Sequence, residues 1–139
     1  MSELRNVITF TIAGVRYALE LRSVREVVSL GFVTLIPTAP PAVSGVCNLH
    51  GAILPVLDVS VLVNGTLGPP ARQGDSGVVV ESEGLTCALR VDQIDHVASL
   101  HEIDGELIDG KGRPLLLLDP ARLLHKALEL VTAEAERQA

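Results

Sequence analysis

The sequence has few aromatic side chains and few positive charges. Its 139 residues include no tryptophan, one tyrosine and two phenylalanines, which leaves almost no platform for stacking bases or sugars. Lysine and arginine number 11 against 17 aspartates and glutamates, so the formal net charge is -6. Nucleic-acid binding usually requires a stripe of basic side chains that contact the phosphates, so this acidic composition argues against it.

Cysteine and long apolar runs are also scarce. The two cysteines are too few for a disulfide framework. Although 47% of the residues are hydrophobic, no apolar run approaches the length needed to cross a bilayer. Residues 1–6 lack the basic start and the apolar region of a secretory signal. We therefore expect a soluble, cytoplasmic protein without direct membrane insertion.

Motifs that support catalysis or metal binding are missing from the sequence. It contains no glycine-rich phosphate loop, no nucleophile elbow and no HExxH pattern. Cys47 and His50 form the only closely spaced cysteine–histidine pair, but side chains three apart on a strand face opposite ways. We expect a protein that is not an enzyme and needs no cofactor or metal. A small cysteine or zinc enzyme is the minor alternative.

The sequence does contain an imperfect duplication. Residues 17–30 recur in outline as residues 87–100, at an offset of 70, and residues 53–63 recur as residues 114–124, at an offset of 61. The second copy is therefore about nine residues shorter between its two parts. We expect one domain over residues 1–139, with lobes formed by residues 7–64 and 78–131.

Short strands separated by turns are predicted along most of the chain. The strands are expected at residues 7–12, 16–21, 43–49, 52–57, 78–81, 85–91 and 114–118. The last of these is wholly apolar, so we expect it to be covered on both faces. His50 and Gly51 are expected to form a tight turn.

Two short helical turns are also predicted. Val24, Val27 and Val28 follow the i, i+3, i+4 spacing, which predicts a helical turn at residues 23–28 and its repeat at residues 92–97.

Asp58 and Asp119 occupy equivalent places in the repeat. Helix N-capping explains both better than a paired-carboxylate active site does. A short helix is expected after Asp58 and a longer one after Asp119, which Pro120 follows. The longer helix has an apolar stripe formed by Leu123, Leu124, Ala127, Leu128 and Val131.

The predicted architecture is mostly β, with two small SH3-like barrels packed together, short helices at strand ends and a C-terminal helix. Residues 65–77 are interpreted as a mobile linker and residues 132–139 as a tail in solvent. Loss of a strand from the second copy would expose a sheet edge there. Self-association through this trimmed lobe is therefore an open alternative.

Residues 43–58 read Val-Ser-Gly-Val-Cys-Asn-Leu-His-Gly-Ala-Ile-Leu-Pro-Val-Leu-Asp and form the most specific pattern of the chain. They resemble the Gly-Val-x-Asn-Leu-Arg-Gly-x-Ile-x-Pro-Val-x-Asp-Leu motif of the CheW family of bacterial chemotaxis adaptors, and the resemblance covers nearly the whole chain. It implies two SH3-like barrels and a non-enzymatic adaptor. Such an adaptor couples the signalling tips of chemoreceptors to the regulatory domain of a CheA-type histidine kinase.

Two departures from the family pattern matter. His50 stands where the family has an arginine that the resemblance places in contact with partners. A guanidinium with five N–H donors is thus replaced by an imidazole whose charge depends on pH. The shortened second copy indicates a reduced paralog that has lost one partner face. An adaptor or array regulator that binds only the receptor or only the kinase is therefore the alternative to a full coupling protein.

The resemblance implies that partners contact residues 43–51. The imidazole of His50 lies at a turn in this segment, where it would contribute little to packing of the core. Arg25 and Glu26 lie on a stretch of mixed charge whose default interpretation is a solvated face. The partner-binding candidates are Val43, Gly45, Val46, Asn48, Leu49, His50, Gly51, Arg25 and Glu26.

Overall fold

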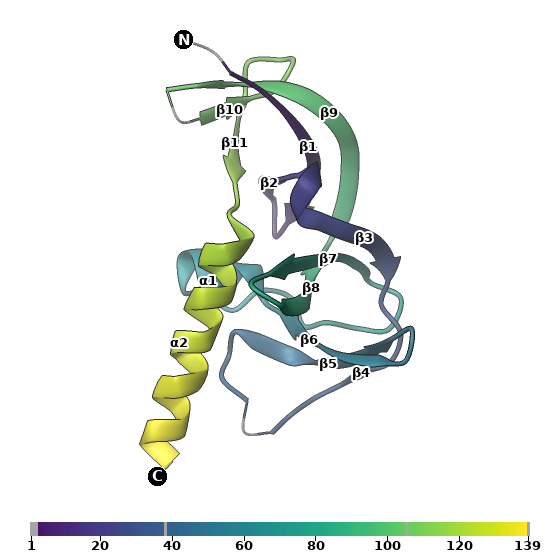
Figure 1. Cartoon of the computed structure of the whole chain (residues 1–139), viewed down its shortest axis with the longest axis vertical. Coiled ribbons are helices and arrows are strands. Elements are labelled where there is room, and N and C mark those ends of the chain that lie inside the picture. Colours follow the sequence, from purple (N-terminus) through teal and green to yellow (C-terminus); the bar gives the residue numbers. More distant parts are fainter. Residues whose placement is uncertain (1–2, 38, 105, 139) are drawn as a thin grey trace.

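The computed structural model describes residues 3–37, 39–104 and 106–138, and most of them lie in two sheets (Figure 1). The first sheet is a closed barrel with the strand order β1-β2-β11-β10-β9, which we call the barrel lobe. Its strands are β1 (Glu3–Ile12), β2 (Val15–Glu20), β9 (Gln93–Ile103), β10 (Glu106–Ile108) and β11 (Pro114–Leu117). The predicted mostly β fold is confirmed.

The second sheet, which we call the sheet lobe, has six strands in the order β3-β7-β8-β6-β5-β4. Its strands are β3 (Val24–Ser29), β4 (Val33–Thr34), β5 (Val43–Leu49), β6 (Ala52–Leu57), β7 (Ser76–Ser82) and β8 (Leu85–Val91). The sheet curls around a core of its own, which includes Leu30, Cys47, Leu54, Val56, Val79 and Ala88.

Each lobe takes strands from both copies of the repeat. The hairpin β1–β2 of the first copy pairs with β9 and β11 of the second copy. The hairpin β7–β8 of the second copy pairs with β3 and β6 of the first. The lobes therefore do not correspond to residues 7–64 and 78–131, because the copies exchange their opening hairpins.

The pairing registers of the two lobes are equivalent. Val56 pairs with Ala88 in the sheet lobe, and Leu117 pairs with Ala18 in the barrel lobe, at the offsets of 61 and 70 found in the sequence. Each lobe also has a β-bulge at the same place. The β3–β7 pairing skips Arg25, and the β9–β1 pairing skips the residue 70 positions later, Asp95.

The largest core lies between the lobes and is formed mainly by the two exchanged hairpins. The rings of Phe10 and Tyr17 stack there with their centroids 5.9 Å apart. Equivalent side chains of the two hairpins meet in this core, and they are Ile8 and Val78, Phe10 and Val80, Tyr17 and Cys87, and Leu19 and Leu89.

The segments predicted as helical turns are strands instead. Residues 23–28 form the end of a short 3-10 turn, η1 (Leu21–Ser23), and most of β3. Residues 93–97 lie in β9. The helical spacing of the three valines was misleading, because β-branched side chains favour a pleated strand and this segment can pair with a neighbouring hairpin.

The length difference between the copies lies in a loop and not in a strand. Strand β4 pairs with β5 at Val33 and Cys47, which are 14 positions apart, whereas β9 pairs with β10 at Glu102 and Leu107, which are only five apart. Strand β10 is short, but it pairs with β9 and β11 as β5 pairs with β4 and β6. In the described part of the chain the barrel is closed, so the open edge expected in the second copy is absent. The alternative of self-association through an open strand edge of the second copy therefore has no support.

Both helices begin where predicted. Helix α1 (Val59–Asn64) follows Asp58, whose Oδ1 accepts the amide of Val61 at 3.2 Å. Helix α2 (Pro120–Gln138) follows Asp119, whose Oδ1 accepts the amide of Ala121 at 3.0 Å. These bonds confirm the interpretation of both aspartates as caps.

Helix α2 is longer than predicted, because residues 132–138 continue it. Of the predicted stripe, Leu123, Leu124 and Ala127 are buried, whereas Leu128 is 53% exposed. The side chain of Val131 is outside the described part of the structure. Neither helix is long and apolar enough, in its described residues, to span a bilayer.

Residues 65–75 have no regular structure, but they are bonded to the sheet lobe. The amide of Gly68 donates to Asp58 Oδ2 at 2.9 Å. The amide of Gly74 donates to the carbonyl of Leu30 at 2.8 Å, and the Leu30 amide donates to the carbonyl of Asp75 at 2.7 Å. The expected linker is thus attached at both ends, and β7 begins at Ser76.

Gly45 of the motif is required by close packing. A Cβ at this position would lie 2.5 Å from the carbonyl oxygen of Thr34 on β4. Since backbone cannot yield easily, we expect Gly45→Ala to lower the free energy of unfolding by about 1–3 kcal/mol in urea denaturation. Gly31→Ala is the matched control, because a Cβ there meets nothing within 4 Å. Equal losses of stability in the two variants would contradict this assignment.

Candidate partner-binding site

Strand β5 divides the candidate residues between two faces. Gly45 and Leu49 lie on the face toward the sheet-lobe core, where Gly45 is buried and Leu49 packs against the core cluster. Val46 and Asn48 alternate with them and lie on the opposite face, where Asn48 is exposed. Val43 packs against the core between the lobes. The candidates therefore do not form one continuous patch.

His50 and Gly51 form the predicted tight turn between β5 and β6. Their φ angles are 52° and 87°, the combination that a type I′ hairpin turn requires. The side chain of Asn48 accepts the Gly51 amide at 3.0 Å and holds this turn in place. The turn directs the imidazole outward, where it is 75% exposed.

The same turn brings His50 next to β3. His50 Nε2 lies 2.8 Å from Glu26 Oε1. Arg25, on the bulge of β3, donates to Glu81 Oε2 at 2.5 Å. Three candidates from distant parts of the sequence thus meet, and two of them had been interpreted by default as a solvated face. The bulge is the local cause, because an extra residue re-aims the side chains beside it.

Arg25, Glu26 and His50 line a pocket of about 230 Å³, which we call the mouth site. Leu54 and Val79 form its apolar base and also belong to the sheet-lobe core, so the pocket is an open end of that core. The rim has both signs of charge. Sequence analysis missed the base, because no local pattern relates Leu54 to a side chain on β7.

The barrel lobe has a counterpart of the mouth site with different charges. Its bulge residue Asp95 accepts the hydroxyl of Thr11 at 2.9 Å, in the place where Arg25 contacts Glu81. His96 takes the place of Glu26, and Arg16 and Arg113 line the neighbouring pocket. The duplicated backbone therefore presents two chemically different surfaces.

Asp109 organises the connection between β10 and β11 in the barrel lobe. Its carboxylate accepts the amides of Arg113 and Lys111 at 2.9 and 2.8 Å and the guanidinium of Arg16 at 2.7 Å. The Arg113 amide first, and then the Arg16 guanidinium, hold the pKa of Asp109 well below its usual range.

The structure separates the only close cysteine–histidine pair. Cys47 is 4% exposed and faces the sheet-lobe core, whereas His50 points to solvent. Burial raises the pKa of the Cys47 thiol and raises that of Cys87 to about 12. Among the described residues, no group of three or more His, Cys, Asp or Glu side chains is arranged to hold a metal. The cysteine-enzyme and zinc alternatives therefore gain no support.

The CheW-like domain family matches residues 6–104, which is more than half of the sequence. The chain belongs to the CheW-like family. The probable chemotaxis protein CheW of Rhizobium etli is 25% identical over 143 residues, covering 97% of this chain and 92% of the relative. The chemotaxis protein CheW of Rhizobium meliloti is 27% identical over 100 residues, covering 72% of this chain and 64% of that protein.

A solved structure shows the same fold. The scaffolding protein TtCheW from Thermoanaerobacter tengcongensis matches with a TM-score of 0.73 at 21% identity, over 87% of this chain and 88% of that one. As a CheW-like protein, the chain is a chemotaxis adaptor and not an enzyme. The resemblance seen in residues 43–58 is confirmed. A reduced paralog is not supported, because β10 is present and 92% of the R. etli relative is matched.

We expect both thiols of this CheW-like protein to be unreactive in the folded state, because burial disfavours the thiolates. Ellman's reagent at pH 8 should therefore label Cys47 and Cys87 only after unfolding in guanidinium. A folded protein whose thiol reacts as fast as free cysteine would contradict the buried assignment and revive the thiol-enzyme alternative.

We expect Asp109→Asn to destabilise the CheW-like fold at pH 7. Because folding lowers the pKa of Asp109, its stabilisation is complete above the unfolded value of about 3.9 and is lost as the pH falls from there toward the folded value. Urea denaturation should show a smaller difference from the parent protein at pH 3 than at pH 7. Asp104→Asn, in an exposed turn, is the control. A difference that grows in acid would refute this role of the charge.

Proposed function

We propose that this CheW-like adaptor couples the signalling tips of chemoreceptors to the regulatory domain of a CheA-type histidine kinase in the cytoplasm. The observation that supports this most directly is the contact of His50 with Glu26 at 2.8 Å, which joins the family's motif to β3 in one exposed site. The residue that replaces the family's arginine is thus still placed at a charged surface.

The chemistry of the mouth site suits a protein partner. Its apolar base is lined by the polar side chains of Arg25, Glu26 and His50, as the core of a protein interface is surrounded by a polar rim. Exposed ion pairs contribute about 1 kcal/mol or less. A partner can therefore replace the His50–Glu26 contact with contacts of its own at little loss.

Coupling needs a second surface, and the sheet lobe has one on the other face of the same strands. Ile53 on β6 is 64% exposed and pairs with Asn48 on β5. Val46 lies two residues earlier on that face, opposite Thr34 of β4. We infer that this outer face, formed by Val46, Asn48 and Ile53, binds one of the two partners and the mouth site binds the other.

The alternative is an adaptor that binds only the receptor or only the kinase. It rested on a strand lost from the second copy, and that strand is present as β10 in the described residues. The structure therefore favours two-partner coupling over this alternative.

We expect the protein to bind both a soluble receptor-tip fragment and the kinase regulatory domain when each is titrated separately in a calorimeter. His50→Ala should weaken one partner by about tenfold, and Ile53→Asp should weaken the other to a similar extent. His101→Ala, an exposed histidine of the barrel lobe, is the control and should leave both affinities unchanged.

The outcomes separate the hypotheses. Binding to one partner alone would overturn coupling in favour of the one-partner alternative, and binding to neither would overturn both. If His50→Ala and Ile53→Asp weaken the same partner, the assignment of separate surfaces is wrong. Circular dichroism of each variant checks that the fold is retained.

A further inference from the structure

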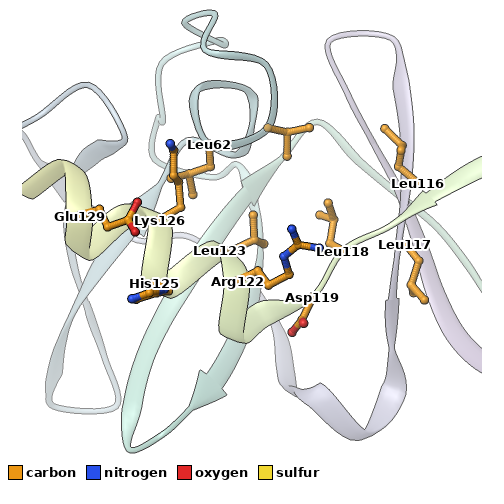
Figure 2. A pocket seen from close by; sticks show the side chains of 11 residues that line it. Leu62, Leu116, Leu117, Leu118, Asp119, Arg122, Leu123, His125, Lys126 and Glu129 are labelled. Carbon is orange, nitrogen blue, oxygen red and sulfur yellow. The ribbon is translucent and has the colours of Figure 1, made fainter.

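A separate groove lies between α1, α2 and the end of β11 (Figure 2), with a volume of about 490 Å³. Leucines from all three elements line it. In Figure 2, Arg122 and Lys126 extend from α2 alongside this apolar lining. We call it the helix groove, and it shares no lining residue with the mouth site. The apolar lining consists of Leu62, Val63, Leu116, Leu117, Leu118 and Leu123.

The helix groove is where the apolar strand β11 is left partly uncovered. The sequence predicts that residues 114–118 are covered on both faces. Leu115 and Leu118 are buried, but Leu116 is 50% exposed, and Val63 on α1, which also lines the groove, is 37% exposed. The prediction is therefore wrong on the face that carries Leu116, and apolar surface adjoins the groove on the strand and on α1.

The rim of the helix groove adds positive charge to this apolar surface. Arg122 and Lys126 lie one helical turn apart, and neither belongs to an ion pair among the described residues. The carboxylate of Asp119 is engaged as the cap of α2, which leaves Glu129 as the other acidic lining residue. Arg122 and Lys126 therefore place two cations, without an ion pair among the described residues, beside the leucines of the groove.

We propose that the helix groove binds a segment of a partner protein that presents leucine-like side chains together with carboxylates. Its apolar side chains would cover Leu116 and Val63, and its carboxylates would pair with Arg122 and Lys126. A small amphiphile is less well matched, because small-molecule sites enclose most of their ligand, whereas Leu116 and Val63 remain exposed here. This partner would bind in addition to the two proposed for the sheet lobe.

The test uses two synthetic peptides of equal length with leucines at the i, i+3, i+4 and i+7 positions. The remaining positions are mostly glutamate in one peptide and glutamine in the other. We expect the acidic peptide to bind the full chain about tenfold more tightly by fluorescence anisotropy. It should shift the methyl resonances of Leu62, Val63 and Leu116 and leave those of Leu49 and Leu54 in the mouth site unchanged.

Two double variants separate local charge from overall charge. Arg122→Glu with Lys126→Glu should abolish the preference for the acidic peptide. Arg72→Glu with Lys111→Glu changes the net charge equally, at exposed cations outside the groove that have no ion pair among the described residues, and should retain the preference. Leu116→Ser should weaken both peptides.

Several results would overturn the proposal. These are equal affinity for the two peptides, loss of the preference in both double variants, and methyl shifts confined to the mouth site. Binding of decanoate but of neither peptide would make the groove an acyl-anion site instead. Affinities for the receptor tip and the kinase domain should be unchanged in Arg122→Glu/Lys126→Glu, so failure here and failure of the proposed coupling are distinguishable.

Discussion

The packing of the two exchanged hairpins against each other is the interaction on which the rest of the structure depends. Hairpins β1–β2 and β7–β8 contribute equivalent side chains to the core between the lobes, where Phe10 stacks on Tyr17. Each hairpin also pairs with strands of the opposite copy. Removal of either hairpin would therefore open one lobe and expose the common core, so the two small lobes depend on each other for stability.

This arrangement fixes several surfaces relative to one another, as an adaptor requires. The mouth site lies at the bulge of β3, the outer face on β5 and β6, and the helix groove between α1, α2 and β11. The mouth site and the outer face lie on opposite sides of the same strands, and the duplication adds a further difference because equivalent backbones present different side chains. Arg25 and Asp95 occupy the same bulge position with opposite charge, so the two lobes cannot offer the same surface to a partner.

Local features of this protein were predictable because they depend on residues a few positions apart. The caps at Asp58 and Asp119 and the His50–Gly51 turn required only the properties of those residues and their neighbours. The helical turn expected at residues 23–28 was wrong, because pairing with β7 outweighed a valine pattern that also suits a strand. The sequence predicted that the motif residues of the mouth site bind partners, but it did not predict that His50 contacts Glu26 on β3.

The sequence by itself determined the strands of the motif, their turns, the helix caps and membership of the family, because short-range chemistry and an uninterrupted motif specify these. Only the tertiary structure decided that the copies exchange hairpins, that the shortened copy still closes its barrel, and that Arg25, Glu26 and His50 meet. The physical reason is that an apolar pattern specifies which face of a strand is buried, but not which of two similar hairpins will cover it.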